Sequence, residues 1–211
     1  MNILDFFIHL DHHLNEIISH YGAWTYLILF LIIFCETGLV FTPFLPGDSL
    51  LFVVGTFAAQ GSLELKVVLP LLLSAAILGN TTNYWIGHFL APRMFRGEKI
   101  PFLKEAYLKR TELYFEKYGG KTIIIAQFAP IIRTCAPFLA GVGSMSYGRF
   151  IRYNVTGAVL WIAGFMLAGY FFGNIPFVKR NLTLVIFAII IISMLPAVRE
   201  FLAHRGASRK K

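Results

Sequence analysis

Long apolar runs constrain the fold of this chain more than any other feature of its sequence. Several of them approach the length of a membrane-spanning helix. They occupy residues 24–34, 67–78, 122–132, 155–172 and 182–198. Only 14% of the 211 residues are charged, whereas about a quarter are charged in soluble domains. The sequence therefore predicts an all-α polytopic membrane protein that forms a single membrane domain over residues 1–211.

The distribution of basic residues predicts the orientation of this domain. No Lys or Arg precedes Lys66, whereas residues 93–121 and 199–211 are rich in both. Because basic loops are retained in the cytoplasm, we expect a cytoplasmic basic segment at 93–121 and a basic cytoplasmic tail at 199–211. This topology accounts for the net charge of +8 without a nucleic-acid partner. Residues 1–21 lack the features of a signal peptide, and their apolar face predicts an interfacial amphipathic helix.

The second half of the chain meets these constraints only with a re-entrant hairpin. Residues 154–174 are expected to cross outward, and residues 182–198 to return as the last transmembrane helix. The basic tail then stays inside only if residues 122–147 enter and leave the membrane on the cytoplasmic face. Broken backbone of this kind is tolerated at membrane depth where protein or water surrounds it.

The first half predicts the same arrangement in the opposite orientation. Residues 24–41 and 49–59 would form a hairpin entered from outside, and residues 67–90 would cross to the cytoplasm. Residues 22–92 and 122–174 are thus an inverted repeat, as in many secondary transporters. Residues that break helices mark the two hairpins. They are Pro43, Pro46, Gly47, Pro130, Pro137 and Gly141.

A weak echo in the sequence relates the two halves. Residues 42–47 (TPFLPG) resemble residues 136–141 (APFLAG). A Tyr-Gly pair precedes each hairpin, and an equal count from each pair ends at Glu36 in the first half and at Arg133 in the second. The echo supports the repeat that the topology predicts.

Three ionisable residues lie at the breaks of the predicted hairpins. Glu36 follows a mostly apolar run, Asp48 follows a Pro-Gly break, and Arg133 lies between two prolines. An ionisable group at bilayer depth costs at least about 2.5–3.5 kcal/mol, so it is retained where it is paired, hydrated or functional. Either acid is expected to pair with Arg133 across the hairpin tips. Two interpretations stay open: a site with Glu36 and Asp48 as proton-handling or gating groups, and a purely architectural ion pair.

Other polar residues in or beside the apolar runs are candidates for lining a cavity, with interhelical hydrogen bonding as the alternative. They are Asn80, Asn83, Tyr84 and Asn154. Trp24, Trp85 and Trp161 are expected to include membrane-interface anchors. The sequence contains no nucleophile elbow, phosphate loop or metal-type Cys/His spacing, so neither an enzyme nor a metal or cofactor site is predicted.

Several motifs, in order along the chain, resemble the signature of the DedA family, which is part of the VTT-domain superfamily. The resemblance covers most of the chain, from about residue 20 to 197. Its motifs are Glu36 followed by Pro43 and by residues 46–50 (PGDSL), then residues 115–122 (FEKYGGKT), 128–134 (FAPIIRT), 136–141 (APFLAG) and 145–147 (MSY), with Phe150, Tyr153-Asn154, Gly157-Ala158 and Trp161.

The resemblance implies two opposed re-entrant hairpins and a place in the bacterial inner membrane. Bacterial members are implicated in recycling undecaprenyl phosphate, with dependence on the proton motive force, and eukaryotic relatives scramble phospholipids. The functional acids of the family correspond to Glu36 and Asp48, and one functional arginine corresponds to Arg133. The chain departs from the family at Gln127, where an arginine is usual, and at Asn80, where an aspartate is frequent.

These observations predict a transporter or flippase of lipid phosphates, with a polyprenyl phosphate or a phospholipid as partner and protons as a further one. Arg133, Gln127 and Thr134 would bind the head-group phosphate. A proton-coupled exporter of small solutes and a non-transporting membrane scaffold are the alternatives. The glycines in residues 154–174 are compatible with a homo-oligomer.

Overall fold

The computed structural model describes residues 22–39, 47–95, 105–143, 145–181, 184–185 and 187–189. Every regular element in these ranges is helical, as the sequence predicts. The elements are α3 (Trp24–Gly38), α4 (Gly47–Ala59), α5 (Leu65–Phe95), α6 (Glu105–Tyr118), η1 (Gly119–Lys121), α7 (Thr122–Ala126), α8 (Pro130–Val142), α9 (Tyr147–Phe172) and α10 (Pro176–Arg180). The predictions for residues 1–21, Pro43, Pro46, most of 182–198 and 199–211 lie outside the described residues.

Two helices in the described part of the chain are long and apolar enough to cross a membrane. They are Leu65–Arg93, within α5, and Tyr147–Phe172, which is α9. α9 begins earlier than the predicted span 154–174. The prediction missed its first two turns because they carry Arg149 and Arg152 on the exposed surface. An apolar run marks only the part of a helix that suits hydrocarbon, so it misses a polar first turn.

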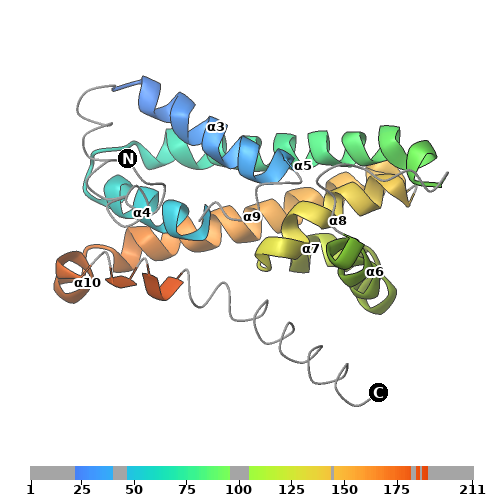
Figure 1. The fold of residues 1–211 in the computed structure, drawn as a ribbon. Coiled ribbons are helices and arrows are strands. Elements are labelled where there is room, and N and C mark those ends of the chain that lie inside the picture. The colour runs from blue at the N-terminus through green and yellow to red at the C-terminus, as the bar shows by residue number, and fades with distance from the viewer. Residues whose placement is uncertain are drawn as a thin grey trace, which may run out of the picture.

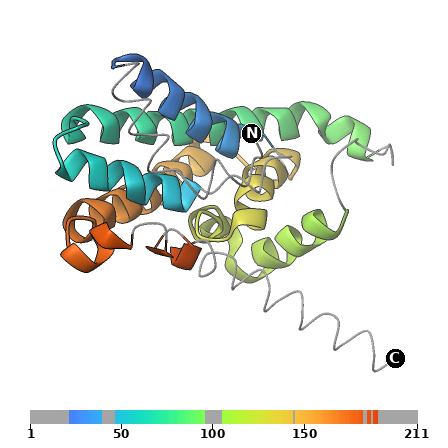
Figure 2. The same cartoon turned by 60° about the vertical axis from the view of Figure 1, so that its left-hand side comes forward.

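A pair of shorter helices precedes each long helix, α3 and α4 before α5, and α7 and α8 before α9. The first helix of each pair lies along the long helix of its own half, α3 on α5 and α7 on α9. The second lies along the long helix of the other half, α4 on α9 and α8 on α5 (Figure 1, Figure 2). This symmetric exchange agrees with an internal repeat, and the direction in which each pair enters a membrane stays a prediction.

Glycines bring the exchanged helices into backbone contact. Gly55 of α4 and Gly169 of α9 each lie against the backbone of the facing helix, and so do Gly87 of α5 and Gly141 of α8. A Cβ at any of the four would overlap a carbonyl oxygen of the neighbour. Gly141 is the penultimate residue of α8, so the helix ends directly after it, and its missing side chain also serves close packing against α5. Its role in turning the chain stays a prediction.

The break in the second helix pair comes earlier than the sequence suggests. Residues 127–129 separate α7 from α8, and Pro130 is the first residue of α8. A proline fits this position because its missing N–H would have no helical partner there. Pro137 does not break the helix, contrary to the prediction, since it lies inside α8. Prolines persist within membrane helices where neighbouring groups satisfy the freed backbone.

The main hydrophobic core fills the space among α3, α4, α5 and α9. Its fully buried members include Leu29, Leu51, Leu72 and Trp161. A second cluster joins α7 and α8 to α5 and α9. The charged residues predicted from the sequence come from the ends of α3, α4 and α8.

Candidate functional site

Glu36 lies in the last turn of α3 and is fully buried. It shares one face of the helix with Thr25, Leu29 and Ile33, at the three- and four-residue spacing that turns side chains inward. The helix itself does not favour a carboxylate at this end, which carries partial negative charge. The stabilisation of Glu36 therefore comes from other elements.

The start of α4 supplies the first of these elements. The Gly47 N–H donates a hydrogen bond to Glu36 Oε1 at 3.1 Å, so this carboxylate lies where the dipole of α4 favours an anion. A Cβ on Gly47 would overlap both carboxylate oxygens of Glu36, so a larger residue would displace them. Asp48 follows in the first turn of α4 and is also buried, at the helix end that suits its charge.

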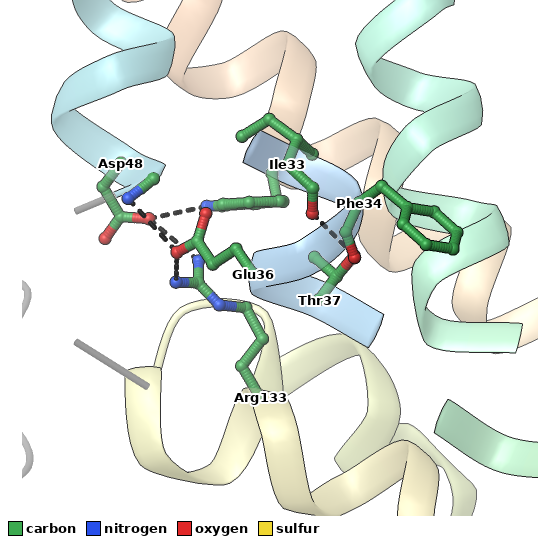
Figure 3. Close-up of polar contacts among 8 residues, drawn as sticks. Ile33, Phe34, Glu36, Thr37, Asp48 and Arg133 are labelled. Carbon is green, nitrogen blue, oxygen red and sulfur yellow. Dashed lines mark hydrogen bonds and ion pairs between the residues drawn. The ribbon is translucent and has the colours of Figure 1, made fainter. Parts of the chain in front are cut away.

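Arg133 reaches the same point from the first turn of α8 and is only 2% exposed. Its Nη2 pairs with Glu36 Oε1, and its Nη1 donates to Asp48 Oδ1 at 3.1 Å (Figure 3). The ion pairs expected between the two acids and Arg133 are thus present. Arg133 Nε and Glu36 Oε2 are buried and have no hydrogen-bond partner among the described residues.

These three side chains carry one excess negative charge when all are ionised, because two carboxylates face one guanidinium. Removing one partner from a buried ion pair costs about 3–5 kcal/mol. Both acids therefore depend on the same cation, Arg133, and one proton would make the cluster neutral.

The equal count from the two Tyr-Gly pairs does not mark equivalent positions. Glu36 precedes the break in its helix pair, whereas Arg133 follows the break in the other. By position, Asp48 in the first turn of α4 corresponds to Arg133 in the first turn of α8. The residue that corresponds to Glu36 is near Gln127, directly after α7.

Trp161 belongs to the site, although its residue type suggested a membrane-interface anchor. It is completely buried in α9. Its indole N–H donates to Asp48 Oδ1 at 2.7 Å, and the Cζ atom of Arg133 lies 4.4 Å from the centroid of its ring, within cation–π range. The sequence did hold a signal, because Trp161 lies in the middle of its apolar run, whereas anchors lie at the ends.

The polar residues of α5 join helices together. Asn83 Nδ2 donates to the carbonyl oxygen of Thr37 at 3.3 Å and to that of Thr134 at 2.7 Å. These two residues directly follow Glu36 and Arg133 in the chain. One amide of α5 therefore ties α3 to α8 beside the ion pair.

Asn80 and Asn154 make a second tie, between α5 and α9. Asn80 Nδ2 donates to Asn154 Oδ1 at 2.8 Å, and Asn154 Nδ2 donates to the Ile77 carbonyl at 3.1 Å. The Tyr84 hydroxyl donates to the Met145 carbonyl. All four candidates for lining a cavity are buried and engaged between elements, so interhelical bonding is the alternative that the structure supports.

Gln127 and Thr134, which were predicted to help Arg133 bind phosphate, are both buried. The side chain of Gln127 packs against Gly157 of α9, and its Oε1 has no partner in the described part of the chain. The carbonyl of Thr134 accepts the bond from Asn83. Their role toward a ligand stays a prediction. Within the described ranges, no three metal-ligating side chains gather in one place.

Comparisons with known proteins identify the family of this chain. The family model described as "VTT domain" matches residues 45–171. Protein DedA of Escherichia coli K12 is 51% identical over 210 residues, which are 99% of this chain and 96% of that protein. An uncharacterized membrane protein of Mycobacterium tuberculosis H37Rv is 43% identical over 185 residues, 85% of this chain and 81% of that protein.

A more distant relative is the inner membrane protein YghB of Escherichia coli K12. It is 32% identical over 162 residues, which are 77% of this chain and 74% of that protein. No solved structure matches the chain. With a family model that covers more than half of its length and a relative similar almost from end to end, the chain belongs to the DedA family of VTT-domain membrane proteins.

Proposed function

We propose that this chain is a transporter or flippase of lipid phosphates in the bacterial inner membrane, without enzymatic activity. Its cargo would be undecaprenyl phosphate or a phospholipid. The observation that carries the proposal is the buried Arg133, held between Glu36 and Asp48 where the two broken helix pairs meet. The basic segments 93–121 and 199–211 would lie in the cytoplasm.

Arginine suits a lipid phosphate because its planar fork binds phosphate oxygens through two parallel hydrogen bonds. A flipped lipid keeps its tail in the bilayer and must carry its head group through hydrocarbon, where an unpaired phosphate is very unfavourable. Arg133 would lower that barrier, aided by the starts of α4 and α8, since helix N-termini favour anions. Glu36 and Asp48 would balance the cation while no head group is bound.

Proton dependence is supported by the charge of the site. Two carboxylates against one guanidinium leave one excess negative charge, which is unfavourable inside a membrane. Uptake of one proton by an acid would neutralise it. The family resemblance implies an arginine where Gln127 stands and an aspartate where Asn80 stands, so these two replacements together would remove one charge of each sign and leave this balance unchanged.

The test compares the flipping of a fluorescent polyprenyl phosphate in proteoliposomes that contain the parent, Arg133→Ala or Arg152→Ala. Arg152 is exposed on α9 and donates to the Gly148 carbonyl, so its removal controls for the loss of a positive charge. We expect Arg133→Ala to slow flipping at least about tenfold, because charged hydrogen bonds contribute about 1.5–3 kcal/mol. Flipping by Arg133→Ala at the parent rate would contradict the role of Arg133.

The same experiment separates the alternatives. A scaffold would lose folding and function together, so a well-folded variant that no longer flips lipid argues against it. An exporter of small solutes would couple protons to a soluble solute in liposomes that contain no polyprenyl phosphate. The double variant Glu36→Gln/Arg133→Gln removes one charge of each sign. It is used in place of Arg133→Ala if Arg133→Ala does not fold.

A further inference from the structure

We infer that the Glu36 carboxylate occupies the place that a head-group phosphate takes during transport. Lipid phosphate would then bind by displacing Glu36 from Arg133 and from the start of α4. The inference rests on the proposed function. It adds that Glu36 competes with the cargo for the site, that Gly47 leaves space for either anion, and that Glu36 takes up a proton when it is displaced.

The donors around Glu36 are those that a phosphate uses. Glu36 Oε1 accepts hydrogen bonds from Arg133 Nη2 and from the Gly47 N–H. A guanidinium edge and the N-terminus of a helix both bind phosphate as well as carboxylate. With 13 residues, α4 is long enough to present such an end.

Glu36 fills this place incompletely. Nε and Nη2 lie on one edge of the Arg133 guanidinium, yet only Nη2 is paired, and Nε is buried with no partner among the described residues. Glu36 Oε2 is buried and unpartnered in the same way. The phosphate monoester of a polyprenyl phosphate has three terminal oxygens, so it can accept from Nε, from Nη2 and from Gly47 together. Two orphaned polar atoms on one ion pair therefore point to a better-matched anion.

Gly47 leaves the space that either anion needs. A Cβ at this position would overlap Oε1, Oε2 and Cδ of Glu36. Gly47 is not one of the glycines with positive φ, so space rather than backbone conformation requires glycine here. A side chain at residue 47 would exclude the Glu36 carboxylate and a phosphate alike.

Of the two acids, Glu36 is the one placed to leave. Asp48 Oδ1 accepts from Arg133 at 3.1 Å and from Trp161 at 2.7 Å, and it lies at the favourable end of its helix. Glu36 lies at the unfavourable end of α3 and has an unpartnered oxygen. Its displacement leaves Arg133, Asp48 and Trp161 in contact as the floor of the site.

Charge balance assigns a proton to the displaced Glu36. The site carries one excess negative charge with Glu36 ionised, and the same charge with Glu36 protonated and a phosphate monoanion bound. The charged groups that face Glu36 in the described structure are Asp48 from α4 and Arg133 from α8. α5 and α9 contribute the uncharged Asn83 amide and Trp161 indole nearby. One proton would therefore travel with each phosphate monoanion.

The test measures binding of farnesyl phosphate to the detergent-solubilised chain by the fluorescence of Trp161, which lies on Arg133. Trp24 and Trp85 are exposed and are replaced by Phe in every sample. Removing a negative charge beside a bound anion strengthens its binding, so we expect Glu36→Gln to bind at least about tenfold more tightly than the parent near neutral pH. The exposed Glu64 provides the matched control, Glu64→Gln, which should bind as the parent does.

The pH dependence provides a second readout. Parent affinity should rise as pH falls, because protonated Glu36 no longer competes with phosphate. Glu36→Gln should lose this rise, and the titration of the probe itself cancels in the comparison. Glu36→Asp, one methylene shorter, should lie between the two and serves in place of Glu36→Gln if that variant misfolds.

Gly47→Ala tests the space itself. Binding should weaken at least about tenfold, since the new methyl group must overlap the anion or shift the start of α4. Gly164→Ala is the matched control, because nothing lies within 4 Å of a Cβ at Gly164.

The outcomes distinguish this inference from the proposed function. Weaker or unchanged binding in Glu36→Gln, or an unchanged pH dependence, overturns the inference even if the parent flips lipid phosphate. Tighter binding in Glu36→Gln, with no flipping by the parent, supports the displaced-carboxylate site and rejects the proposed function.

Discussion

The two broken helix pairs share one packing plan and differ in their chemistry. In both halves the first helix lies along its own long helix and the second crosses to the other. The first pair places an acid on each side of its break, Glu36 and Asp48. The second places an amide, Gln127, at the break and a cation, Arg133, after it.

This difference shows that the polar site is a product of both halves. The acids of the first helix pair are paired with the cation of the second, so neither helix pair supplies counter-ions for its own charges. The long helices differ in the same way. Asn83 of α5 binds the backbone beside the charges, whereas Trp161 of α9 binds Asp48 itself. The shared packing brings the positions together, and divergence between the halves makes them complementary.

Removing the cation, Arg133, should have the largest effect on stability. Arg133→Met should lower the free energy of unfolding by about 3–5 kcal/mol, because it leaves two buried carboxylates without a counter-ion. Adding Glu36→Gln and Asp48→Asn should recover most of the loss. Denaturant unfolding in detergent measures both, with Arg152→Met as the surface control. A triple variant as unstable as Arg133→Met would mean that charge balance does not set the stability of the site.

Removing the tie from α9 should have a smaller effect. Trp161→Phe keeps an aromatic ring beneath Arg133 and deletes the hydrogen bond to Asp48. The expected loss of unfolding free energy is about 1.5–3 kcal/mol, as for other bonds to buried charges. Trp85→Phe, at an exposed position, should change stability by less than about 0.5 kcal/mol. Equal losses of unfolding free energy in the two variants would show that the Trp161 hydrogen bond does not stabilise the site.

At the glycine contacts between α4 and α9 and between α5 and α8, the two halves are expected to behave alike. Gly55→Ala and Gly141→Ala each push a methyl group against the backbone of the facing helix, and each should cost about 1–3 kcal/mol. Gly164→Ala has open space and should be neutral or stabilising by up to about 1 kcal/mol. Thermal unfolding in detergent compares the three. A clear inequality between Gly55→Ala and Gly141→Ala would show that the two crossings are not equivalent.

The predictions that succeeded rest on properties that are local in the sequence. Apolar length identified α5 and α9, and isolated charges identified the buried ion pairs of Arg133 with Glu36 and Asp48. The predictions that failed concern residues whose role depends on a neighbour from elsewhere in the chain. Pro137 has the composition of a turn, yet α8 continues through it, and α5 packs closely against α8.

The amino-acid sequence alone was enough to identify a helical membrane protein of the DedA family and to show which ionisable groups lie among apolar residues. The free energy of placing a residue in the membrane depends on that residue and its neighbours in the sequence, so composition and order are enough to reveal these features. The contact of Glu36 with Arg133, 97 positions away, became visible in the folded chain, and so did the parts that Trp161 and Gly47 have in the site. Such contacts depend on how close two backbones come, and that distance is set by the packing of whole helices.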